Sequence, residues 1–195
     1  MIVVGVDCGF SGAIAHYCTR TKDLDVIDMP VILNSKGKNE IDIHSLLHLL
    51  EPEAKDRMAV VEQVASRPNQ SSVATFRFGM GYGALIACVA ANKTPMHLVT
   101  PQKWKKHFGL TSDKDTSRQL AMQRFPDYAE KFVRKKDDGR AEAALEIIAS
   151  EATPDPTDLQ FNYEYTVRFD LEKDRVRALL LSAEAELALG RPIEA

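Results

Sequence analysis

The chain has 195 residues, of which 45% are hydrophobic and 27% are charged, which is typical of a globular protein with an ordinary core. This length supports one well-packed domain plus an appendage and excludes two full enzyme domains. The formal net charge is −3, but residues 151–195 hold five basic and ten acidic residues, and residues 1–150 hold 20 basic and 18 acidic ones. The overall charge therefore does not exclude a nucleic-acid partner for the first 150 residues.

The N-terminus and the cysteines indicate the compartment. The apolar run before Asp7 is too short for a secretory signal, and nothing approaches a membrane-spanning length, so we expect a cytoplasmic protein without a membrane partner. The three cysteines (Cys8, Cys18 and Cys88) form no CxxC pair and cannot all pair, which predicts reduced thiols.

The predicted elements begin with three strands, 2–7, 13–18 and 24–29, separated by turn residues and forming an antiparallel meander. A polar loop at 34–39 leads to a helix at 40–50, which Pro52 ends, and then to a wholly apolar strand at 58–62. The remaining core elements are a helix at 71–91, a strand at 96–100, a short helix starting at Pro101, a helix capped by Ser112 or Asp113 that reaches about Phe125, and a helix at 138–149.

This order of elements, βββαβαβαα, predicts an α/β protein with a ribonuclease H-like five-stranded mixed sheet flanked by helices. We assign residues 1–152 to that domain. Residues 153–158 have a linker composition, residues 161–169 alternate apolar and polar as in a half-buried strand, and 171–189 has a helical pattern. Residues 153–195 are therefore expected to form an acidic strand–helix extension, docked on the core or on a dimer partner.

Four carboxylates stand at positions that would bring them together. Asp7 and Glu62 end two apolar strands, and Asp138 and Glu142 are four residues apart on one helix face. A charge at the end of a buried strand is costly unless a cation or a partner compensates it. Hard divalent cations with oxygen ligands fit such a set, and two of them can support hydrolysis of a phosphodiester.

Three sequence blocks carry a family resemblance: VGVDCG at 4–9, VVEQV at 60–64 and DGRAEA at 138–143. In this order they resemble the catalytic blocks of the RuvC-type Holliday junction resolvases. The stretches 67–83, 99–106 and 125–126 are similar to the phage branch of that family, so the resemblance covers about residues 1–150.

The resemblance implies cleavage of branched DNA, especially four-way junctions, by a homodimer in a bacterial or phage-infected cytoplasm. It implies that Asp7, Glu62, Asp138 and Glu142 are the catalytic, metal-binding acids of a site with two Mg²⁺ ions, for which Mn²⁺ substitutes. There are two departures from the family pattern. Ala65 stands where bacterial members carry a functional aromatic, and the last two acids are four rather than three residues apart.

Basic residues flank the acids in two runs, which we expect to contact DNA phosphates. The expected contacts are Lys103, Lys105, Lys106, Arg134, Lys135 and Lys136, together with Lys114, which corresponds to a lysine that the family uses near the scissile phosphate. Trp104, within the first run, is expected to fill the core. The glycines at 79, 81 and 83 would let two copies of helix 71–91 approach closely in a homodimer with two-fold symmetry.

Other functions remain open at this point. The Asp7–Gly12 turn is similar to the phosphate-binding hairpin of actin-like and hexokinase-like ATPases, but those proteins need a second hairpin and a far longer chain. A broader debranching nuclease for flaps and forks is the nearest alternative. A non-catalytic junction-binding protein on the same fold is the alternative from another class, although such a module has no reason to hold four acids facing a polyanion.

Overall fold

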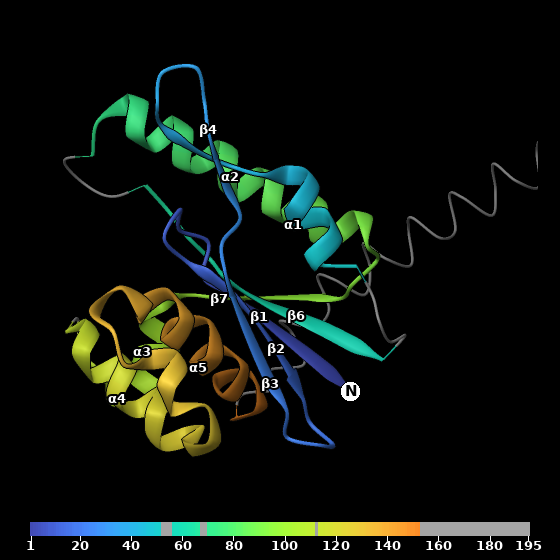
Figure 1. The fold of residues 1–195 in the computed structure, drawn as a ribbon, viewed down its shortest axis with the longest axis vertical. Helices are drawn as coiled ribbons and strands as arrows, with labels where there is room; N and C mark the ends of the chain where they lie inside the picture. The colour runs from blue at the N-terminus through green and yellow to red at the C-terminus, as the bar shows by residue number, and fades with distance from the viewer. Residues whose placement is uncertain (52–55, 67–69, 112, 153–195) are drawn as a thin grey trace, which may run out of the picture.

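The computed structural model describes residues 1–51, 56–66, 70–111 and 113–152. These ranges make up the predicted nuclease-like domain apart from three short gaps (Figure 1). The predicted linker, strand and helix of residues 153–195 lie outside the described residues, as does Ser112.

The domain is built on a five-stranded mixed sheet in the order β3-β2-β1-β6-β7. Strands β1 (Ile2–Val6), β2 (Ala13–Cys18) and β3 (Leu24–Asp28) form the predicted antiparallel meander. Strand β6 (Arg57–Glu62) then pairs with β1 in parallel, and β7 (Met96–Val99) pairs with β6 in parallel. The central strands β1 and β6 are apolar along almost their whole length because helices cover both faces of the sheet.

Helices lie on both faces of this sheet (Figure 1). One face packs against α5 (Asp138–Ala152), which α3 (Pro101–His107) and α4 (Lys114–Arg124) accompany, and the other packs against α1 (Ile43–Leu49) and α2 (Ser72–Ala91). Alternate residues of β1 divide between the two cores: Val3 packs with Trp104 and Leu145, and Val4 packs with Leu46 and Leu85. Two 3₁₀ segments, Pro126–Phe132 and Lys135–Asp137, connect α4 to α5.

The segment after β3 differs from the prediction. Strands β4 (Val31–Leu33) and β5 (Asn39–Ile41) pair as a small antiparallel hairpin around the expected polar loop. The helix expected from residue 40 therefore begins only at Ile43, because residues 39–41 pair with β4 and Asp42 caps the helix by accepting the Ser45 amide at 3.3 Å. The last core helix is also longer than expected and reaches Ala152.

The other helix starts follow the predicted signals. Ser71 caps α2, Pro101 is the first residue of α3, and Asp113 caps α4. The expectation that no segment approaches a membrane-spanning length is wrong for helix α2. Its 20 residues are long and apolar enough to cross a membrane by length and composition alone. Core helices of non-membrane proteins pass the same test, and Leu85, Cys88 and Val89 of α2 are buried against the sheet.

Candidate active site

Asp7 and Glu62 follow two neighbouring parallel strands at the same edge of the sheet. Val6 of β1 pairs in register with Val61 of β6, so the two acids come next on adjacent strands. The Gly9 amide donates a hydrogen bond to Asp7 Oδ1 at 3.2 Å, and Glu62 is only 8% exposed. The structure therefore brings these two predicted residues together, as parallel pairing requires.

Helix α5 reaches this edge because two glycines let it lie directly on main chain. A Cβ at Gly5 would stand 2.0 Å from the Ala143 carbonyl oxygen, and a Cβ at Gly139 would stand 2.6 Å from Gly12 Cα. Real Cβ atoms essentially never come within 3.0 Å of such neighbours. The lack of a side chain at Gly5 and Gly139 thus allows the close packing that presents α5 to the ends of β1 and β6.

Glu142 lies on the inner face of α5, 8% exposed, and α3 supplies its counter-charge. Lys105 Nζ is 2.9 Å from Glu142 Oε1 and also lies over the Trp104 ring, 4.9 Å from its centroid. The Trp104 indole donates a hydrogen bond of 3.4 Å to Glu62 Oε1. Trp104 is therefore the buried core residue that the sequence predicts and, in addition, a hydrogen-bond partner of the second acid.

A fifth acid, Glu146, joins this group and was missed from the sequence. It lies one turn after Glu142 and is completely buried. Burial raises the pKa of Glu146 well above its ordinary value, and the charges of Glu62, Asp7 and Glu142 raise it further. The main chain of Val6 lowers this pKa by a smaller amount.

The Cys8 thiol is affected by the same charges. Burial, then Glu146, Asp7 and Glu62, raise its pKa well above the usual value, so this cysteine is a protonated core residue. The charges of Asp7 and Glu62 raise the pKa of both Cys8 and Glu146, so these acids form one electrostatic cluster. A sequence signal for Glu146 does exist, since Asp138, Glu142 and Glu146 repeat at intervals of four residues on one helix face.

Asp138 lies at the first residue of α5 and has a cationic partner. Its Oδ1 is 3.1 Å from Arg118 Nε of α4, and the Asp138 side chain is 17% exposed. Arg118 also pairs with Asp115 and donates to the Val133 carbonyl at 2.9 Å. The structure thus groups Asp7, Glu62 and Glu142 with Glu146. Asp138, which lies one turn before Glu142 on α5, pairs instead with Arg118 of α4.

The predicted DNA-contacting residues differ in their surroundings. Lys103 and Lys106 of α3 and Lys135 and Lys136 before α5 are exposed, whereas Lys105 is paired with Glu142. Arg134 pairs with the buried Asp137 at 2.9 Å and caps the 3₁₀ segment before α5. Lys114 begins α4, and its side chain lies outside the described part of the structure.

The donor set at the sheet edge suits a hard divalent cation, because it consists of carboxylates and because both oxygens of buried Glu146 lack a hydrogen-bond partner among the described residues. Within the described ranges, no three possible ligands already converge on one point. These acids would therefore have to move closer together to share an ion. Asp7, Glu62 and Glu142, together with Glu146, are the residues that could hold it.

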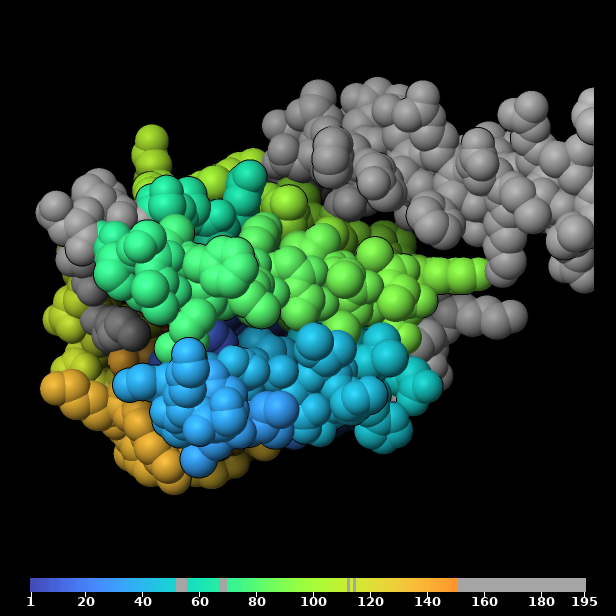
Figure 2. Space-filling view, turned by 90° about the horizontal axis from the view of Figure 1, so that it is seen from above, coloured from blue at the N-terminus to red at the C-terminus, as the bar shows by residue number. Residues whose placement is uncertain are grey.

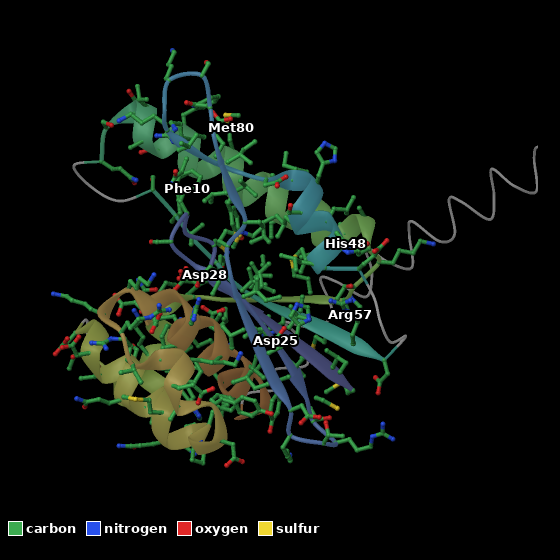
Figure 3. The ribbon with its side chains drawn as sticks, in the orientation of Figure 1. Phe10, Asp25, Asp28, His48, Arg57 and Met80 are labelled. Atoms are coloured by element: carbon green, nitrogen blue, oxygen red, sulfur yellow. The ribbon has the colours of Figure 1, made fainter. Side chains whose placement is uncertain are left out.

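A hollow of about 570 Å³ lies at the other end of the strands. It opens between the sheet and α1, with Asp25, His48 and Arg57 among its lining residues (Figure 3). Arg57 begins β6 and Glu62 ends it, so this hollow is separated from the acids by the length of a strand. We assign the candidate site to the acid cluster because the hollow contains no comparable group of coupled carboxylates.

Comparisons with known proteins support the fold and not the chemistry. No protein-family model and no curated protein sequence matches the chain. A solved structure of Thermus thermophilus RuvC in complex with a Holliday junction substrate is similar, with a TM-score of 0.54 and 13% identity over 78% of this chain and 95% of that one. A second T. thermophilus RuvC structure has a TM-score of 0.47 and 17% identity over 78% of this chain and 96% of that one. The first of these similarities shows that the domain has a RuvC-like fold, and the predicted five-stranded mixed sheet flanked by helices is confirmed.

Proposed function

We propose that this chain is a metal-dependent endodeoxyribonuclease that cleaves four-way DNA junctions. The observation that carries the proposal is that Asp7 and Glu62 end neighbouring parallel strands of a RuvC-like fold, where they belong to one group of interacting carboxylates with Glu142 and Glu146 of α5. The similar T. thermophilus protein was solved with a Holliday junction substrate, and this motivates the choice of DNA. Two Mg²⁺ ions per site, with Mn²⁺ as a substitute, are part of the proposal, with Asp7, Glu62, Asp138 and Glu142 as ligands.

When bound, the metal ions would supply an activated water and stabilise the charge that develops on the phosphate oxygens. The residues of the chain have separate tasks. Trp104 holds one oxygen of Glu62 and thereby fixes the direction of that side chain. Lys105 compensates Glu142 in the present arrangement and lies within reach of a phosphate at the same edge. Asp7, oriented by the Gly9 amide, is central to the set.

Positioning of the DNA is assigned to the exposed lysines. Lys103 and Lys106 lie on α3, and Lys135 and Lys136 precede α5, so the two groups flank the element that carries Glu142. Contacts of this kind bind the phosphate backbone without reading the sequence. This arrangement suits a nuclease that recognises the shape of a branch.

A homodimer is part of the proposal because paired, symmetric nicks require two sites related by a two-fold axis. Helix α2 runs across the face seen in Figure 2, beside α1 and the β4–β5 hairpin. Large apolar side chains are exposed on these elements, including Val73, Phe76 and Met80 on α2. Gly79 and Gly83 have open space where a Cβ would stand, while Gly81 packs against Ile41. We assign this face to the partner copy.

The test is incubation of end-labelled four-way junction with the protein, with and without Mg²⁺. Symmetric nicks in opposing strands that depend on Mg²⁺ and disappear in Asp7→Asn would support the proposal. Equal cleavage of flaps and forks would favour the broader debranching nuclease. Tight junction binding without cleavage in Mg²⁺ or Mn²⁺ would mean a non-catalytic binding protein and would refute the proposed reaction.

A further inference from the structure

Glu146 is unusual because it is an acidic residue buried in the core. Its side chain is completely buried, and neither of its oxygens has a hydrogen-bond partner within the described residues. Its neighbours in α5, Leu145 and Ile147, are fully buried apolar residues. A buried carboxyl group without partners is costly, and an apolar residue of similar volume would ordinarily be more stable in its place.

The position of Glu146 is set by main-chain contacts. Ala143 and Ile147, on the same face of α5, touch the place where a Gly5 side chain would stand, so α5 cannot move away from β1 without losing this packing. Glu146 lies between these two residues in sequence, one turn beyond Glu142. The charges that act on Glu146 are those of Glu62, Asp7 and Glu142, which indicates that it lies at the same end of β1 and β6 as these acids.

Asp7, Glu62, Glu142 and Glu146 place four carboxyl groups at this edge, and Lys105 pairs with Glu142. A divalent cation would compensate their charge and would coordinate the two oxygens of Glu146, which have no hydrogen-bond partner in the described part of the chain. We infer that Glu146 is a further metal ligand, binding the same divalent ion as Asp7 after rotation of the surrounding side chains. This inference rests on the proposed function, since it concerns the same site.

Metal binding without DNA tests the inference separately from cleavage. Mn²⁺ and Mg²⁺ are titrated into metal-free wild type and Glu146→Gln by calorimetry, and thermal unfolding is followed with and without Mn²⁺. Glu130→Gln is the matched control, because Glu130 is an exposed acid of the segment Pro126–Phe132, whose loss removes the same charge outside the group of carboxylates that interact with Glu146.

We expect Glu146→Gln to bind Mn²⁺ about tenfold or more weakly than wild type. Its Mn²⁺-induced rise in Tm should shrink accordingly, and its metal-free Tm should equal or exceed that of wild type because a buried acid has been removed. Glu130→Gln should bind as wild type does. If Glu146→Gln fails to fold, Glu146→Met, which fills a similar volume without polar atoms, takes its place.

Equal Mn²⁺ affinity of wild type and Glu146→Gln would overturn the inference and leave Glu146 as a structural acid, with the proposed nuclease unaffected. Absence of Mn²⁺ and Mg²⁺ binding by wild type would overturn both the inference and the proposed metal site. A loss of affinity that Glu130→Gln reproduces would also overturn it, because the effect would then be one of general charge.

Discussion

Adding one methyl group at Gly5 should destabilise the domain and misplace the acid cluster. The new Cβ would lie 2.0 Å from the Ala143 carbonyl oxygen and 2.8 Å from Ile147 Cγ1. Because the nearer neighbour is main chain, relief requires α5 and β1 to separate by about 1 Å, the shortfall from the 3.0 Å limit.

Overpacking of this kind costs about 3 kcal/mol, a large part of the roughly 5–15 kcal/mol that stabilises a typical domain. For a domain of this size the corresponding loss in Tm is about 6–12 °C. A displacement of about 1 Å between catalytic groups lowers rates by about 100-fold, so cleavage should fall further than stability explains.

The measurement is thermal unfolding of Gly5→Ala by circular dichroism, with junction cleavage assayed well below the Tm. Asp127→Glu is the control for an added carbon atom, because Asp127 is an exposed residue of the segment Pro126–Phe132, outside the α2 face assigned to the partner copy. This control should be as stable as wild type within about 0.5 kcal/mol. A Gly5→Ala protein with wild-type Tm and cleavage would refute the idea that close packing of α5 on β1 builds the site.

Three further changes test other parts of the structure. Asp7→Asn should abolish cleavage while junction binding, measured by gel shift, stays equal or tightens because a charge facing the phosphates is lost; substantial Mg²⁺-dependent cleavage would contradict the site. Burial favours a raised pKa for Asp137, but the hydrogen bonds from Arg134 outweigh it and lower this pKa. The stabilisation from Asp137 is therefore fully present above about pH 4, the ordinary pKa of aspartate, and declines as the pH falls through the lowered pKa. Asp137→Asn should cost about 2 kcal/mol at pH 7 and progressively less on acidification in denaturant titrations; a cost independent of pH would contradict this. Phe76→Glu should convert the dimer to a monomer in light scattering, whereas Val133→Glu, which alters an exposed residue away from α2, should not; a dimeric Phe76→Glu would exclude this face.

Local sequence signals predicted most elements of the domain. Alternation, apolar runs and turn residues located the strands of the sheet, and Ser71, Pro101 and Asp113 marked helix starts that the structure confirms. These signals act within a few residues, which is why a sequence alone reveals them. The β4–β5 hairpin was missed because its short, exposed strands carry little alternation, and because Ile43, Leu46 and Leu50 extended a helical pattern back over residues 40–42.

The residues of the candidate site also differ in whether the sequence alone predicts them. Asp7 and Glu62 could be predicted from sequence, because an acid ending an apolar strand is unusual and two parallel strands deliver such residues to one edge. The same helix periodicity that selected Asp138 and Glu142 also passes through Glu146, but nothing local distinguishes a buried turn of the helix from an exposed one.

Only the tertiary structure decided which of these acids share an environment. The main-chain contact of α5 with Gly5 buries Glu146 beside Asp7 and Glu62, and the packing of α4 brings Arg118 to Asp138. Both outcomes depend on contacts between residues far apart in the chain. Sequence periodicity therefore determined which residues face the same side of α5, and the docking of that helix on a strand without a side chain determined how deep each one lies.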